Sequence, residues 1–547
     1  MPGSGRSTPR SIFRSAGIVS AAVSLSRITG LVRQMVMARL FGAGAVYDAY
    51  LLGFRIPNLT RDLFAEGALS AAFVPVFTQY LSTKGKREAA ELSNLVATAL
   101  LLIVGLFCLL GIVFSPQLVW LLAPGFQAVP GKFELAVLLT RLMFPFLLLV
   151  ALAAQAMAIL NACHRFGVPA LSSTCFNLGS VACGLLIGYS FGPRLGIGLP
   201  AAMACGVVLG GALQIAWQVP SLRREGFSFR PRIDFSHPGL RRIFRMMGPA
   251  ILGNAALQIN VMVNTNFASG ITDAAGRVIN GPVSWLAYAF RFMQLPLGLF
   301  GGALAAATLP AISRSAALGR MAEFRQTLSQ SLGMVFLLTI PSAVGLAILG
   351  ESMIGLVFQW GKFQAFDTHQ TALALAAYAV GLTGYAATKI LTPAFYALHD
   401  SRTPMLVSVI EVGVNLAAAS GLVKAAGLGH LGLALSTSIV ALSGSAILFL
   451  LLRARIGRWG GRARAISIAR IAAASAAMGA VCLLSSRAVN QWAVHYWMNS
   501  PRMARVADVM LSVPLGLITF IVLCRLLRVA ELETVWKALW KEKIANS

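Results

Sequence analysis

Arginine residues in two neighbouring apolar segments are the residues of this chain best suited to chemistry. Arg27 and Arg33 lie in one segment, and Arg55 and Arg61 lie in the next. An arginine at the centre of a bilayer costs at least about 2.5–3.5 kcal/mol, so arginines repeated in this way are expected to serve a function. The guanidinium stays charged when it is buried and can bind phosphate or carboxylate oxygens bidentately. The pattern therefore predicts a binding site for an anionic ligand.

Other polar residues in apolar segments are candidates to complete this site. Arg291 lies in a later segment, and Asn58, Asp62 and Glu66 follow Arg55 at helical spacing. Asp62 and Glu66 are predicted to form ion pairs with some of the arginines, which leaves the others for the ligand. Because cations outnumber anions in the apolar segments, we expect the cavity that these residues line to be net positive.

Some charged residues have two interpretations. Arg39 and Arg141 lie near segment ends and are predicted to reach the membrane interface. Asp48 opens its segment, so it is either a helix cap or a cavity residue involved in gating.

Glu411, with Asn415 four residues later, is a separate candidate. Glu411 either neutralises Lys389 or His399 as a structural partner, or it binds a coupling cation together with Asn415. The sequence leaves both alternatives open.

The segments that must position these residues are membrane-spanning helices. The chain is 57% hydrophobic and 12% charged, and its mean hydropathy is +0.76, which excludes an ordinary soluble protein of 547 residues. Windows of about 20 residues, the length that crosses a bilayer, predict about fourteen spans. The predicted spans are 15–41, 46–80, 92–115, 134–161, 169–191, 196–218, 243–268, 282–312, 326–349, 370–397, 404–424, 430–452, 466–486 and 508–528. The second, eighth and tenth contain Pro57, Pro296 and Pro393 and are expected to be broken.

The distribution of the 45 lysine and arginine residues predicts the orientation of the chain. Most of them fall on one side of the membrane when the N-terminus is cytoplasmic, as the positive-inside rule requires. Both termini are then cytoplasmic. The basic loops are expected to contact anionic lipid headgroups, so the net charge of +27 does not indicate nucleic-acid binding. No metal-ligand spacing, nucleotide-binding loop or catalytic triad is present, so we expect neither an enzyme nor a protein with a metal cofactor.

An internal repeat organises the chain. The stretch GALSAAFVP at 67–75 recurs as GALAAATLP at 302–310, which is 235 residues later. The same offset relates His164 to His399. These matches predict two six-helix lobes in a parallel repeat, with the substrate site between them. The predicted domains are an N-terminal lobe over 1–220, a basic cytoplasmic linker over 221–242, a C-terminal lobe over 243–453, and two further helices with a tail over 454–547.

These residues carry a resemblance to a known family. The stretches are SRITG at 26–30, FGAG at 41–44, RIPN at 55–58, FAEGA at 64–68 and FVP at 73–75, together with Arg33, Asp48, Arg61 and Arg291. Together they resemble the signature of the MurJ (MviN) lipid II flippases. The resemblance implies the fold of the MOP exporter superfamily and places the family's cavity arginines at Arg27, Arg33, Arg61 and Arg291. Where many members have acidic residues beside two of these arginines, this chain has Gln34 and Phe290, so we expect weaker ion pairing in a closed state.

The resemblance also implies a function and a location. The expected activity is the translocation of lipid II, an undecaprenyl-pyrophosphate-linked disaccharide peptide, across a bacterial cytoplasmic membrane by alternating access. A membrane potential or a coupling cation would set the direction. A monomer is expected, with membrane lipids and cell-wall synthesis enzymes as further partners.

Four alternatives remain open. The cargo could be another polyprenyl-pyrophosphate glycan of the O-antigen type. A drug exporter for cations is disfavoured because it would need an acidic cavity. A non-transporting scaffold for cell-wall synthesis leaves the buried arginines unexplained. An intramembrane enzyme acting on polyprenyl phosphates lacks a carboxylate cluster.

Overall fold

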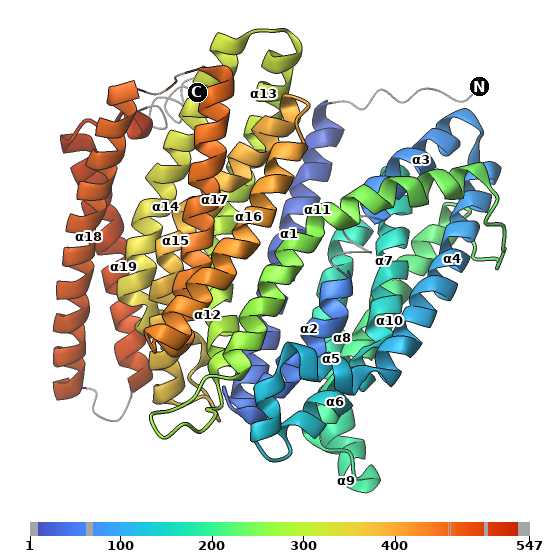
Figure 1. Cartoon of the computed structure of the whole chain (residues 1–547), viewed down its shortest axis with the longest axis horizontal. Coiled ribbons are helices and arrows are strands. Elements are labelled where there is room, and N and C mark those ends of the chain that lie inside the picture. Colours follow the sequence, from blue (N-terminus) through green and yellow to red (C-terminus); the bar gives the residue numbers. More distant parts are fainter. Residues whose placement is uncertain (1–8, 62–68, 458, 460, 497–500, 534–547) are drawn as a thin grey trace. The chain divides into compact units, whose positions relative to one another are not determined.

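The computed structural model is built from helices (Figure 1). It describes residues 9–61, 69–457, 459, 461–496 and 501–533, and these contain no β-strand. Eleven helices in this part of the chain are long and apolar enough to cross a membrane. The chain is therefore a multi-pass membrane protein, as its composition predicts. Three predicted spans, 15–41, 46–80 and 243–268, are helical where they are described but are not among the eleven.

Contacts between residues divide the chain into two compact units. The first contains Met1–Gly270 and Gly276–Asn280, and the second contains Ile271–Ala275 and Gly281–Ser547. The long helices of the first unit are α1 (Pro9–Phe41), α2 (Ala45–Arg61), α3 (Ser70–Thr83), α4 (Lys86–Val113), α6 (Lys132–Met143), α7 (Pro145–Ala162), α8 (Gly167–Leu186), α10 (Leu199–Arg224) and α11 (Pro238–Ser269). The shorter ones are α5 (Ser115–Leu122), η2 (Pro124–Ala128), η3 (Ile187–Phe191) and α9 (Gly192–Leu195).

The second unit contains the remaining helices. They are α12 (Pro282–Pro296), η4 (Leu297–Gly302), α13 (Ala303–Ala317), α14 (Met321–Phe358), α15 (Ala365–Ala397), α16 (Arg402–Ala419), η5 (Ser420–Ala425), α17 (Gly429–Ile456), α18 (Gly461–Tyr496) and α19 (Pro501–Leu526). Contacts group α11 with the first unit, whereas the predicted C-terminal lobe begins at 243. The two divisions differ because α11 packs against α3 and α5, while the prediction follows the sequence repeat.

The helix boundaries follow the repeat. Each half has a helix that starts after a short turn, a helix that ends at an alanine, and a helix that starts five residues after that alanine. The corresponding boundaries are Lys86 and Met321, Ala162 and Ala397, and Gly167 and Arg402. All three pairs are separated by 235 residues, so the duplication seen in short motifs extends to the secondary structure.

Two histidines show that the backbone follows the same repeat. His164 and His399 both have a φ of 58°, a left-handed conformation that is uncommon for residues other than glycine. After each histidine the next backbone N–H bonds back to a helical carbonyl, from Arg165 to Leu160 at 2.8 Å and from Asp400 to Phe395 at 2.9 Å. Both helices therefore end in the same left-handed cap.

An ion pair holds each of these turns to the last helix of its half. Arg165 pairs with Glu225 at 2.8 Å, just after the end of α10. Asp400 pairs with Arg455, near the end of α17. The two pairs have opposite polarity, and their partners at the end of the last helix lie five residues apart in the repeat. The turn carries the cation in the first half and the carboxylate in the second, although the backbone of the two turns has the same conformation.

The turn at Asp400 predicts a dependence of stability on pH. Hydrogen bonds from Thr403, with a further contribution from Arg455, hold the pKa of Asp400 at about 2, below its ordinary value of 3.8. The carboxylate therefore stabilises the fold above about pH 4. We expect this stabilisation to disappear as the pH falls toward 2, and to be under about 1 kcal/mol because Arg455 is half exposed. Unfolding of wild type and Asp400→Asn, measured from pH 2 to 6, should converge at the acid end. A constant difference across this range would contradict the expectation.

Pro57 does not break the second predicted span, because α2 continues through this proline to Arg61, the last residue described before 69. In the eighth predicted span α12 ends at Pro296. After Pro296 the chain forms the π-helical turn η4 before α13 begins. π-Helical turns inside long helices are frequent at functional sites. The predicted break at Pro393 does not occur, because α15 continues through this proline to Ala397. Neighbouring helices compensate for a missing N–H in a buried span.

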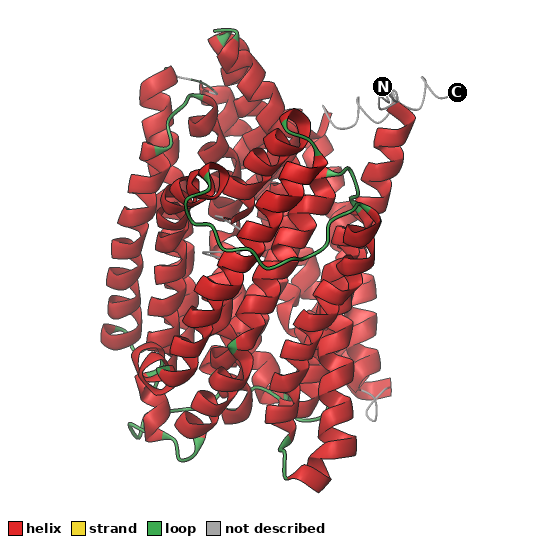
Figure 2. Cartoon of the chain, turned by 90° about the vertical axis from the view of Figure 1, so that its right-hand side faces the viewer, coloured by secondary structure: helices red, strands yellow, loops and turns green. Residues whose placement is uncertain are grey.

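The connection between α10 and α11 is a loop that lies along α4 (Figure 2). The backbone N–H groups of Arg230 and Arg232 donate to side chains of α4, at 3.2 Å to Asn94 and 3.1 Å to Thr98. Arg232 also pairs with Glu91. The predicted basic linker is thus fixed to α4 by both its backbone and its charge.

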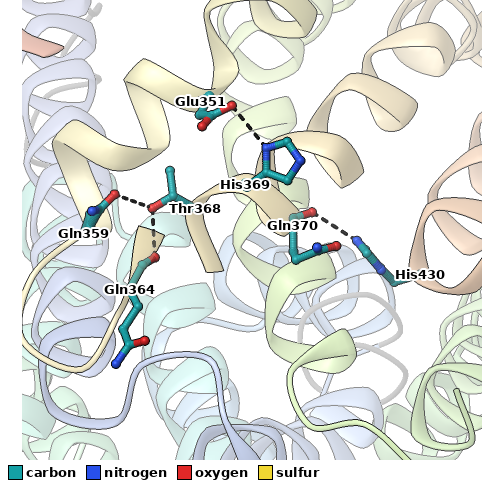
Figure 3. Close-up of polar contacts among 7 residues, drawn as sticks. All are labelled: Glu351, Gln359, Gln364, Thr368, His369, Gln370 and His430. Atoms are coloured by element: carbon teal, nitrogen blue, oxygen red, sulfur yellow. Dashed lines mark hydrogen bonds and ion pairs between the residues drawn. The ribbon is translucent and has the colours of Figure 1, made fainter. Parts of the chain in front are cut away.

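The start of α15 is joined to its neighbours by polar contacts (Figure 3). The Thr368 hydroxyl donates a hydrogen bond at 2.8 Å to the side-chain oxygen of Gln359, in the loop that precedes the helix. The ring of His369 lies 3.3 Å from the Glu351 carboxylate of α14, and that of His430, on α17, lies 3.1 Å from the Gln370 carbonyl. These contacts hold α14, α15 and α17 together at one end of the second unit.

Candidate functional site

Arg33 is held by aromatic rings. Its guanidinium carbon lies 5.5 Å from the centre of the Phe54 ring and 5.2 Å from that of Phe176. Phe146 stacks against Phe176 with 5.1 Å between the centres. Among the described residues no carboxylate pairs with Arg33. The rings of α2 and α8 stabilise its cation by the cation–π interaction and fix its position without neutralising it.

Arg61 lies close enough to Arg33 for their charges to repel each other. Tyr47 and Tyr50 of α2 also lie within electrostatic range of the Arg33 guanidinium. The structure therefore brings two of the predicted arginines together in the first unit.

Arg27 lies on α1 with its side chain exposed in this unit. It makes no hydrogen bond or ion pair with another described residue. Between Arg27 and Arg33, α1 is held to α8 because Asn177 donates to the carbonyl of Ser26 at 3.2 Å and to the Thr29 hydroxyl at 3.4 Å. This contact fixes the part of α1 that carries both arginines.

The polar residues of α2 have different surroundings. Arg55 donates to the hydroxyl of Thr265 on α11 at 2.5 Å. The side-chain oxygen of Asn58 is buried and has no hydrogen-bond donor in the described structure, and the same holds for Gln34 beside Arg33. Buried acceptors without donors are rare in folded proteins and call for an explanation. A bound ligand with hydroxyl or amide N–H groups would provide one.

Asp48 forms a buried ion pair that the sequence analysis did not identify. The ammonium nitrogen of Lys132 lies 2.9 Å from the Asp48 carboxylate, and both side chains are almost fully buried. Lys132 also donates to Asn280 at 2.9 Å and lies 4.2 Å from the centre of the Phe126 ring. Lys132 falls just before the predicted span 134–161, and nothing in its local sequence marks it as a partner of α2.

Two predicted ion-pair residues, Asp62 and Glu66, lie outside the described residues. The structure therefore says nothing about their partners.

Arg291 belongs to the second unit, where it lies half-buried on α12. Its neighbour Phe290 is part of an aromatic cluster, with its ring centre 5.4 Å from that of Tyr378 and 6.5 Å from that of Tyr385. The resemblance predicted that an acidic residue would be common at position 290. Here the same position contributes aromatic packing between α12 and α15.

Glu411 and Asn415 both face α17. A Cβ atom on Gly444 would lie 1.7 Å from a carboxylate oxygen of Glu411, so the carboxylate lies against the backbone of α17. Asn415 is buried and accepts a hydrogen bond from Ser436 at 3.3 Å. Within the described residues Glu411 has no ion pair with Lys389 or His399. Its carboxylate therefore lacks the structural partner that one interpretation required.

Known structures share this fold. The lipid II flippase MurJ in an inward closed conformation superposes with a TM-score of 0.74 at 24% identity, covering 93% of this chain and 98% of that one. An inward-facing multidrug resistance MATE family transporter of the MOP superfamily superposes with a TM-score of 0.61 at 14% identity, covering 80% and 94%. At these identities the likeness shows the fold alone.

Comparison of the amino-acid sequence with known proteins identifies the family. The family model described as "Lipid II flippase MurJ" matches residues 37–501. The lipid II flippase MurJ of Burkholderia cenocepacia is 35% identical over 448 residues, which cover 81% of this chain and 84% of that protein. The probable lipid II flippase MurJ of Haemophilus influenzae is 33% identical over 488 residues, covering 86% and 92%. The chain therefore belongs to the MurJ family of lipid II flippases.

Proposed function

We propose that this protein translocates lipid II from the inner to the outer leaflet of the bacterial cytoplasmic membrane by alternating access through a cationic cavity. The observation that carries this proposal is the setting of Arg33, a cation in an apolar segment. Among the described residues, two aromatic rings and no carboxylate contact it. A cation held in this way is suited to bind an anionic ligand.

The chemistry of the cargo matches these groups. The pyrophosphate and the acidic peptide of lipid II need compensation for their charge when the headgroup leaves water. Arg27, Arg33, Arg61 and Arg291 would provide that compensation. The free acceptors of Gln34 and Asn58 would accept hydrogen bonds from sugar hydroxyl or peptide N–H groups. No bond is broken, so the protein binds and releases its cargo and is not an enzyme.

The test is transport by purified protein in liposomes. We expect labelled lipid II to reach the opposite leaflet, and a lipid carrying an O-antigen sugar to move at least about tenfold more slowly. Equal rates would favour a general carrier of polyprenyl-pyrophosphate glycans. An absence of transport would favour a scaffold for cell-wall synthesis enzymes.

The predicted arrangement of the chain in the membrane is part of this proposal. The two lobes, 1–220 and 243–453, would alternate around the cavity in a single protomer, with both termini cytoplasmic. In the second unit the ends of α13 and α17 and the start of α18 are rich in arginine. These residues are Arg314, Arg453, Arg455, Arg462 and Arg464. This end agrees with the positive-inside rule if it faces the cytoplasm.

A coupling cation at Glu411 and Asn415 is a second element of the proposal. In the part of the chain that the structure describes, the Glu411 carboxylate forms no ion pair, and Asn415 and Ser436 place oxygen atoms on the same pair of helices. Oxygen ligands of this kind suit a hard monovalent or divalent cation. The membrane potential would otherwise provide the driving force.

Replacing the carboxylate tests this element. We expect Glu411→Gln to remove the stimulation of flipping by a sodium or potassium gradient, because the amide keeps the shape but not the charge. The matched control is Glu351→Gln, since Glu351 is an exposed carboxylate of α14. Transport assays with and without each gradient would decide. A response to the gradient that persists in Glu411→Gln would contradict the site.

A further inference from the structure

A polar cavity of about 350 Å³ lies in the second unit, and none of the proposed substrate-binding residues lines it. It is lined by the first turns of α14 and α18 and by Trp459, which precedes α18. The lining includes Arg325, Gln326, Ser329, Trp459 and Arg464. Helices α14 and α18 pack against each other, and both are candidate membrane spans that begin here. The cavity therefore lies at the level where a span meets the membrane surface.

The two arginines of the cavity are held in place by neighbours. Arg464 donates to the Ser329 hydroxyl at 2.9 Å and pairs with Glu531. Arg325 donates to the carbonyl of Ile456 at 3.2 Å. Glu531 also accepts a hydrogen bond from Ser467, so it is well satisfied. Two cations and one carboxylate leave the cavity with a net positive charge, and the fixed side chains lose little entropy when a ligand binds.

Trp459 provides an independent indication of a ligand. Its indole ring packs on Phe449 with 4.9 Å between the ring centres. The indole N–H is buried, and no acceptor for it exists in the described part of the chain. A buried donor without an acceptor is costly, and an anionic oxygen is the strongest acceptor available to it. The N-termini of two helices add partial positive charge at the same place.

We propose that this cavity is a binding site for a phosphate group, separate from the transport pathway. Arg325 and Arg464 would bind its oxygens, and Trp459 would donate a third hydrogen bond. Anionic phospholipids at the membrane surface and free phosphate in solution carry the same chemistry. This site would give the protein a contact with phosphate at one fixed place, beyond the general attraction of its basic loops.

The test uses the purified full-length protein after removal of bound lipid. Native mass spectrometry would measure the dissociation constant of short-chain phosphatidylglycerol, and equilibrium dialysis would measure that of radiolabelled inorganic phosphate. For the probe that the site binds, we expect Arg325→Gln to raise the dissociation constant about tenfold and Trp459→Phe to raise it about threefold, because each removes one hydrogen bond to a charged group. Trp459→Phe keeps the packing on Phe449, so it remains informative if Arg325→Gln unfolds.

The matched control is Arg453→Gln. Arg453 is an exposed arginine of the last turn of α17 and does not line the cavity, so its loss changes the net charge equally. Weaker phosphatidylglycerol binding in the cavity variants alone would identify the lipid headgroup as the ligand. Weaker binding of inorganic phosphate alone would identify the soluble anion. Equal effects of all three variants, or no effect, would overturn the proposal.

Discussion

Replacing Arg33 by alanine is expected to lower the rate of lipid II flipping at least about thirtyfold. Removing one partner of a buried charged contact costs about 2–5 kcal/mol, and Arg33 would be such a partner for the anionic headgroup. Arg61→Ala should have a similar effect, because the two cations lie within electrostatic reach of each other. Transport of labelled lipid II in liposomes, at matched protein content, measures the change.

Two variants distinguish this role from a structural one. Arg33→Lys keeps the charge but loses the planar contact with Phe54 and Phe176, so it should recover only part of the activity. Arg39→Ala removes an exposed arginine from the last turn of the same helix and should transport at the wild-type rate. The cavity proposal fails if Arg33→Ala unfolds at the wild-type temperature and still transports at the wild-type rate.

The second large effect is expected for the buried pair between Asp48 and Lys132. Lys132→Met would leave the Asp48 carboxylate buried without its cation, which typically costs about 3–5 kcal/mol. We therefore expect a strong loss of folded protein and a lower unfolding temperature. Thermal unfolding of the purified protein, together with its yield in the membrane, provides the measurement.

The control for this prediction is Lys362→Met, which removes an exposed lysine and should leave unfolding unchanged. Adding Asp48→Asn to Lys132→Met removes the unpaired charge and should restore part of the stability. If the single and double variants unfold alike, the loss comes from the packing of Lys132 on Phe126 rather than from the ion pair.

The buried pair also restricts the movement of α2 relative to α6 during transport. It joins the start of α2 to the start of α6, and Asn280 adds the loop that follows α11. A conformational change that separated these elements would have to expose or neutralise both charges. We therefore expect the start of α2 and the start of α6 to move together.

The sequence by itself determined the class of the protein, the positions of its helices and the candidate arginines. Apolar runs of the length of a bilayer are a local property of the chain, so the predicted spans are helical where the structure describes them, apart from short turns. The repeat could be found because its motifs keep one offset, and the helix boundaries of the structure keep the same offset. Arg33 and Arg61 were identified from their charge in apolar surroundings alone, which needs no knowledge of contacts.

Only the tertiary structure decided which residues meet. Lys132 is 84 positions from Asp48, and Thr265 is 210 positions from Arg55. The rings around Arg33 come from two other helices. No periodicity relates such residues, because helix packing rather than spacing along the chain brings them together. The continuity of α15 through Pro393 has the same cause, since the neighbours of a proline decide whether its helix breaks.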